Sequence, residues 1–117
     1  MVDGVTYPRF ATKKLADALS DSPAVLLHGP RQCGKSTLAQ AVGEPLGFTY
    51  LTFDDNNLLE AAKADPQGFV GDLPERTILD EIQHVPELFR SIKSAIDRNR
   101  QPGRFLLTGS ANVFLVP

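Results

Sequence analysis

Eight residues, Gly29 to Ser36, limit the folds open to this chain more than any other feature. They read GPRQCGKS and fit the pattern G-x-x-x-x-G-K-[ST] at every fixed position. The glycines of this pattern let the backbone wrap around an oxyanion with its N–H groups pointing inward. Lys35, which we expect to face solvent when no ligand is bound, can then reach the β- and γ-phosphates, and the hydroxyl of Ser36 can ligate Mg²⁺. The expected nucleotide contacts are Gly29, Pro30, Arg31, Gln32, Cys33, Gly34, Lys35, Ser36 and Thr37.

The segments that flank this loop favour the same interpretation. Residues 24–27 are a short apolar run that predicts a buried strand. Residues 37–42 predict a helix that Gly43 and Pro45 end. A strand, a glycine-rich loop and a helix, in this order, are the context in which the pattern binds phosphate, and the positive end of the helix dipole adds to the anion site.

The rest of the chain alternates between helical and strand patterns. Helices are expected over 11–20, from the capping residues 54–57 to about 64, and in a segment with Pro86 in its first turn and an apolar stripe from Leu88 to Ile96. A short helical turn or loop is expected from 65 to 73, and further strands over 47–53, 77–80 and 104–108. Three of the strands are continuous apolar runs, which is typical of a parallel sheet covered on both faces. The predicted fold is therefore α/β, a parallel sheet between helices.

Two acidic residues, Asp80 and Glu81, stand at the end of the apolar strand 77–80. An aspartate at such a strand end can hold Mg²⁺, and the glutamate after it can act as general base on an attacking water. The carboxyl ends of parallel strands share one edge, so both side chains can reach a ligand crevice there. Alone, the pattern also fits two solvated carboxylates. Asp54 and Asp55 end the second strand at the same edge, where support of the site and helix capping are both open.

A polar turn, Thr108 to Asn112, follows the last predicted strand. Thr108, Ser110 and Asn112 are each candidates for a hydrogen bond to the γ-phosphate or to the attacking water. An ordinary strand-exit turn is the alternative. For His28, a satisfied buried histidine is the expectation, and His84 is expected at the surface.

Composition narrows the range of partners. The 117 residues carry a net charge of −2, which gives no general affinity for nucleic acid or acidic membranes. The single cysteine allows no disulfide within the chain. No apolar run approaches the ~20 residues that span a bilayer, and the N-terminus lacks the pattern of a signal peptide. We expect a cytoplasmic protein without a membrane partner.

Taken together, the motifs resemble a bacterial and archaeal group of AAA+-type ATPases. The resemblance rests on the phosphate loop and on the segments LTFDD (51–55), LDEIQHVPE (79–87) and FLLTGSA (105–111), in this order. It implies that 29–36 is the Walker A loop, that Asp80 and Glu81 are the Walker B pair, and that sensor 1 lies within 108–110. It also implies ATP and Mg²⁺ as cofactors.

The resemblance also implies that residues 1–117 are the N-terminal part of an ATP-binding domain. Members of the group are usually longer and continue into a C-terminal domain of poorly known function. Their sheet places the phosphate-loop strand between the sensor strand and a fifth strand, which would lie beyond Pro117 together with the lid and the arginine finger. The first strand would then be an open edge, and the apolar residues 113–116 would have no sheet to join, so we expect self-association.

The activity expected from these features is binding and hydrolysis of Mg-ATP, with water activated through Glu81. A nucleotide-gated switch or binding module with little hydrolysis is an alternative, and a small-molecule kinase is another. What the hydrolysis would drive stays open between a nucleic acid and a protein client.

Overall fold

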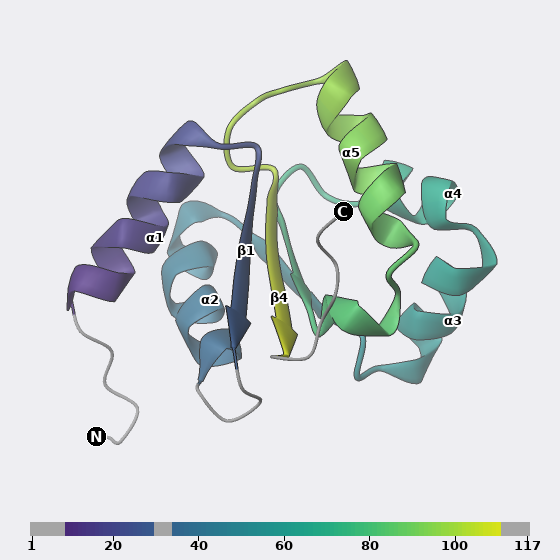
Figure 1. The fold of residues 1–117 in the computed structure, drawn as a ribbon, viewed down its shortest axis with the longest axis horizontal. Helices are drawn as coiled ribbons and strands as arrows, with labels where there is room; N and C mark the ends of the chain where they lie inside the picture. Colours follow the sequence, from purple (N-terminus) through teal and green to yellow (C-terminus); the bar gives the residue numbers. More distant parts are fainter. Residues whose placement is uncertain (1–8, 30–33, 111–117) are drawn as a thin grey trace.

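A computed structural model describes residues 9–29 and 34–110 of the chain (Figure 1). The helices are α1 (Arg9–Asp21), α2 (Lys35–Gly43), α3 (Asn56–Ala64), α4 (Pro66–Gly71) and α5 (Leu88–Arg98), with short 3-10 turns at Glu44–Leu46 and Ile82–His84. The strands are β1 (Ala24–Gly29), β2 (Thr49–Thr52), β3 (Thr77–Asp80) and β4 (Phe105–Ser110). Within these residues, no helix has the length and apolar character needed to cross a membrane.

The strands form one parallel sheet in the order β1-β4-β3-β2. All four carboxyl ends therefore lie at one edge, which is where an open α/β sheet binds its ligands. Within the described residues β1 pairs only with β4, so one side of β1 is an open edge. The predicted α/β fold, with a parallel sheet of the phosphate-loop NTPase type between helices, is confirmed.

Alternate residues of each strand feed two separate hydrophobic clusters. Ile78 and Leu106 pack with α1 and α2 on one face, whereas Leu79 and Leu107 pack with α3, α4 and α5 on the other. Figure 1 shows the two groups of helices on opposite sides of the sheet. Because both faces are covered, β1, β3 and β4 each contain a continuous apolar run, as the sequence predicted for three of the strands.

Asp80 and Thr108 belong by position to the face covered by α2. Asp80 follows Ile78 by two residues and Thr108 follows Leu106 by two, and successive strand side chains alternate between faces. This register brings both side chains to the carboxyl edge, beneath the first turn of α2.

Several element ends differ from those predicted. Helix α2 begins at Lys35, directly after Gly34, whose φ of 78° suits glycine. Strand β2 begins at Thr49 because Gly47, at φ 92°, closes the preceding turn. Residues 66–71 are a helix, and its N-cap Asp65 accepts from the amide of Gly68. Helix α5 begins at Leu88, so Pro86 precedes its first turn and the predicted placement was wrong.

Candidate functional site

The carboxylate of Asp80 is the centre of the polar group at the carboxyl edge of the sheet. It is 3% exposed and accepts four hydrogen bonds, all from hydroxyl groups. Its Oδ1 accepts from Ser36 at 2.5 Å and from Thr108 at 2.6 Å. Its Oδ2 accepts from Tyr50 at 2.8 Å and from Thr52 at 3.0 Å. The four donors come from α2, β4 and β2, so Asp80 joins three elements around β3.

Two threonines connect Asp80 to the other acids of the site. The hydroxyl of Thr52 donates to Asp80 and accepts from the backbone N–H of Asp54 at 3.1 Å. The hydroxyl of Thr108 donates to Asp80 and accepts from the backbone N–H of Glu81 at 3.0 Å. Each hydroxyl therefore uses both its donor and an acceptor position. The backbone that carries all three acids is held in one hydrogen-bonded unit.

These contacts keep Asp80 ionised. Burial raises the pKa of its carboxyl, but hydrogen bonds from Ser36, Thr108, Tyr50 and Thr52 to the charged form outweigh that effect, and the pKa lies below its ordinary value of 3.8. The reciprocal effect appears at Tyr50. Burial, the hydrogen bond to Asp80 and the negative charge of Asp80 raise the pKa of its hydroxyl to about 12.

Glu81 lies directly beyond β3, at a bend in the chain. Its φ of 59° places it in the left-handed region, the single non-glycine residue there among those described. Such a conformation is costly for an ordinary side chain and is found where the surroundings impose it. Here the amide of Glu81 is bonded to Thr108, and its Oε1 accepts from Nε2 of Gln83 at 2.6 Å. The side chain is 6% exposed, which contradicts the alternative of two solvated carboxylates.

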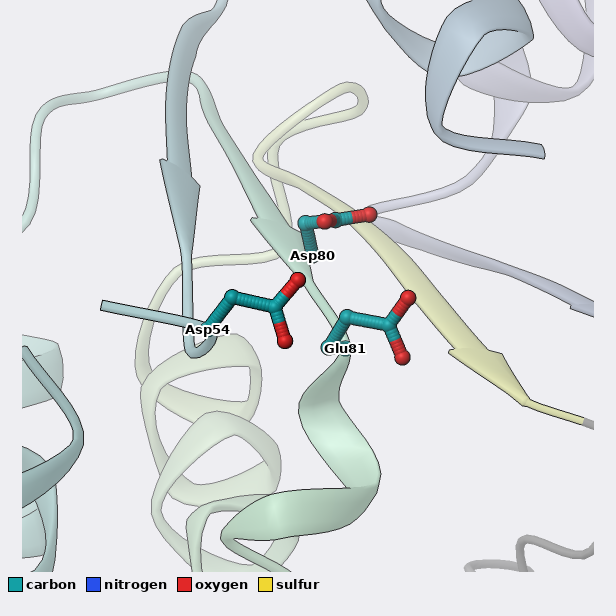
Figure 2. Close-up of side chains that lie close together, drawn as sticks. All are labelled: Asp54, Asp80 and Glu81. Carbon is teal, nitrogen blue, oxygen red and sulfur yellow. The ribbon is translucent and has the colours of Figure 1, made fainter. Parts of the chain in front are cut away.

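Asp54, Asp80 and Glu81 form a compact carboxylate group. One oxygen from each lies within 4.8 Å of the others. Figure 2 shows the three side chains at the ends of β2 and β3, with the carboxylate of Asp54 directed toward the other two. Nε2 of His84, an exposed residue as predicted, lies 3.8 Å from Oδ1 of Asp54. Asp54 thus adjoins the site, whereas Asp55 caps α3, accepting from the amide of Asn57 at 2.8 Å.

The structure corrects two expectations about basic side chains. Lys35 was expected to face solvent, but it is only 5% exposed. It lies in the first turn of α2, which packs on β1, β3 and β4, and a lysine stem is readily buried there. His28 was expected to be buried but is exposed, because it lies at the end of the open edge strand β1.

Other predicted site residues are placed only in part. Ser36 is half-buried against Asp80, and Thr37 is exposed in the first turn of α2. Ser110 ends β4 opposite Gly29. Pro30, Arg31, Gln32 and Cys33, and the sensor candidate Asn112, lie outside the described residues.

Sequence reasoning missed Tyr50, Thr52 and Gln83. Tyr50 and Thr52 are two residues apart near the end of a strand, so they share a face. If the second and third strands are taken as neighbours, that spacing predicts that both hydroxyls lie beside Asp80. Gln83 stands two residues after Glu81, within reach only because the chain turns there.

The comparisons with known proteins identify the family of this chain. A family model described as an AAA domain matches residues 21–117. The chain belongs to the AAA domain family. Membership carries a nucleotide-binding domain of the phosphate-loop NTPase type, in keeping with the fold and with a site at the carboxyl edge of the sheet.

Two relatives are similar over most of the chain. Both are uncharacterized proteins, one from Mycobacterium bovis and one from Mycobacterium tuberculosis, each 41% identical over 109 residues. The match covers 92% of this chain but 24% of each relative. This AAA domain therefore spans about a quarter of the length of the curated relatives it matches.

Proposed function

We propose that this AAA domain binds Mg-ATP and hydrolyses it. The observation that carries the proposal is the hydrogen bond from Ser36 to Asp80 at 2.5 Å. It joins the last residue of the G-x-x-x-x-G-K-[ST] pattern to the first strand-end acid across 44 positions of the chain. Two motifs whose chemistry is complementary, one for phosphate and one for metal and water, are thereby brought to one place.

The donor set at this place fits Mg²⁺. Hydroxyl and carboxylate oxygens are the hard ligands that this ion prefers, and Ser36 and Asp80 supply one of each. We propose these two residues as its holders, with Asp54 at the margin of the same group. When bound, the ion would neutralise charge on the phosphate oxygens.

The remaining roles follow from position and chemistry. Lys35 would interact with the β- and γ-phosphates, and Glu81 would take the proton of the attacking water. Thr108 already donates its single hydroxyl proton to Asp80. We therefore assign the sensor contact with the γ-phosphate to Ser110 or Asn112, and give Thr108 the task of holding Asp80 and the amide of Glu81.

Release of phosphate from ATP without any acceptor tests the proposal. The wild-type protein is expected to release phosphate only with Mg²⁺, and Glu81→Gln is expected to bind ATP normally while its turnover falls by at least about 100-fold. Release that needs an added acceptor would instead indicate a kinase. Equal turnover by wild type and Glu81→Gln would remove Glu81 from the role of base.

A nucleotide-gated switch with little hydrolysis is a second candidate. The hydrogen bond from Gln83 to Oε1 of Glu81 favours it, because that bond occupies an oxygen that a general base would use. Gln83→Ala distinguishes the two. A rise in turnover would show that the bond restrains the base, whereas a fall would show that it positions the base for hydrolysis.

A further inference from the structure

Tyr50 and Thr52 donate hydrogen bonds to the carboxylate of Asp80, and they belong neither to the phosphate loop nor to the acidic pair. They lie on β2, at the far side of β3 from β1, and their hydroxyls donate to Oδ2 of Asp80 at 2.8 and 3.0 Å. The register pairs Thr52 directly with Asp80 and Tyr50 with Ile78. The parallel pairing of β2 with β3 thus delivers two hydroxyls to one oxygen.

The two oxygens of Asp80 have different kinds of partner. Oδ1 accepts from Ser36 and Thr108, which belong to the phosphate-loop helix and to the sensor strand. Oδ2 accepts from β2 alone among the bonds described. A carboxylate has about four lone-pair positions, and here four donors fill them. Any ligand that binds Asp80 directly must therefore displace one of these hydroxyls.

We propose that Tyr50 and Thr52 form a hydroxyl clamp, which fixes Oδ2 and thereby presents Oδ1 to Ser36 and to the metal that accompanies the nucleotide. This inference rests on the proposed binding of Mg-ATP. Tyr50 is a positioning residue in this scheme, because it acts through Asp80. Its hydroxyl sets how much Mg²⁺ is needed for tight nucleotide binding, and contributes nothing to binding without metal.

The chain offers a closely matched set of variants. Tyr50→Phe removes one hydroxyl and keeps the half-buried ring, and Thr52→Val removes the other at nearly constant volume. Thr49→Val is the control, because Thr49 is an exposed threonine of the same strand whose side chain faces the opposite side from Tyr50.

The test measures by calorimetry how tightly a non-hydrolysable ATP analogue binds at increasing Mg²⁺ concentrations. The Mg²⁺ midpoint is the concentration that gives half of the full effect on binding. Tyr50→Phe is expected to raise the Mg²⁺ midpoint by roughly tenfold, the effect of losing a hydrogen bond to a charged group, and to leave metal-free affinity within about twofold. Thr49→Val should match the wild type. In an Asp80→Asn background, Tyr50→Phe should produce no further shift, because the charged partner is gone.

Two outcomes overturn the clamp. One is a wild-type Mg²⁺ midpoint in Tyr50→Phe, and the other is an equal loss of affinity with and without metal, which a structural defect would cause. A wild-type protein that binds no nucleotide at any Mg²⁺ concentration overturns the proposed function itself. A denaturant-unfolding cycle of Tyr50→Phe with Asp80→Asn, without nucleotide, separates these cases, since coupling below about twofold in the unfolding constant contradicts the clamp alone.

Discussion

At the scale of single residues, burial of Lys35 changes how its role must be tested. An alanine would remove the buried stem as well as the charge, so a loss of binding could come from lost packing. Lys35→Met keeps the stem. We expect it to unfold at nearly the wild-type temperature and to bind ATP about 10- to 100-fold more weakly, the effect of losing charge-assisted contacts with the phosphates. Wild-type affinity of Lys35→Met in calorimetry would contradict the phosphate-loop assignment.

Asp80 gives a prediction about acid stability. Its pKa in the folded protein lies below the ordinary value of 3.8, so ionised Asp80 favours the folded state. That contribution is fully present above pH 3.8 and is lost as the pH falls through the lower, folded pKa. We expect wild type to lose stability more steeply than Asp80→Asn below about pH 3.8, and in parallel with it between pH 5 and 7. Denaturant unfolding at several pH values measures the free energy of unfolding of both proteins. If the two free energies change in parallel over the whole pH range, the hydroxyls do not stabilise the ionised carboxylate.

The contacts of Asp80 also show where sequence reasoning at this scale stops. Ser36 and the acidic pair could be proposed from the sequence because the motifs that contain them are defined by spacing along the chain, and the structure brings Ser36 and Asp80 together. Tyr50 and Thr52 were not found because their contacts depend on which strand lies beside β3 and in what register. Lys35 was placed in solvent because a charge suggests exposure, whereas the long apolar stem allows burial.

At the scale of elements, Asp54 and Asp55 have different roles, and the sequence left open which of them caps a helix and which adjoins the site. Asp55 caps α3 through the amide of Asn57, whereas Asp54 points toward Asp80 and Glu81. We expect Asp55→Ala to lower the free energy of unfolding by about 1 kcal/mol, the usual cost of losing an N-cap, with nucleotide binding unchanged. Asp54→Ala should change stability by less than about 0.5 kcal/mol, as expected for an exposed residue, and raise the Mg²⁺ needed for binding. Denaturant and Mg²⁺ titrations measure both effects. A stability loss in Asp54→Ala together with a raised Mg²⁺ requirement in Asp55→Ala would contradict these separate roles.

The order and kind of elements were largely predictable, and their ends less so. Strand, loop and helix around Gly34 followed from apolar runs and glycine positions. The sequence left the 65–73 segment open between a helical turn and a loop, because a six-residue helix offers little periodicity. The structure shows the helix and its N-cap, in which Asp65 accepts from the amide of Gly68. Only the position of the first strand beside the sensor strand came from the resemblance to AAA+-type ATPases, because apolar patterns alone do not say which strands are neighbours.

At the scale of the whole molecule, the open edge of β1 leads to a prediction about association in solution. In the described part of the sheet, the pairing of β1 with β4 leaves the other side of β1 without a strand. Exposed strand edges pair readily with other chains, and natural proteins block them with charged side chains. Among the residues of this strand whose exposure is described, His28 is the exposed one, and β1 contains no lysine, arginine, aspartate or glutamate.

We therefore expect this chain to self-associate as its concentration rises. Light scattering over about 5 to 200 μM should show a growing mean mass. His28→Lys adds a charge to the exposed position of the edge and should reduce that growth, while Lys93→Arg, an exposed conservative change on α5, should leave it unchanged. A constant monomer mass for wild type at every concentration would show that the edge is protected. Equal association by His28→Lys would place the contact on another surface.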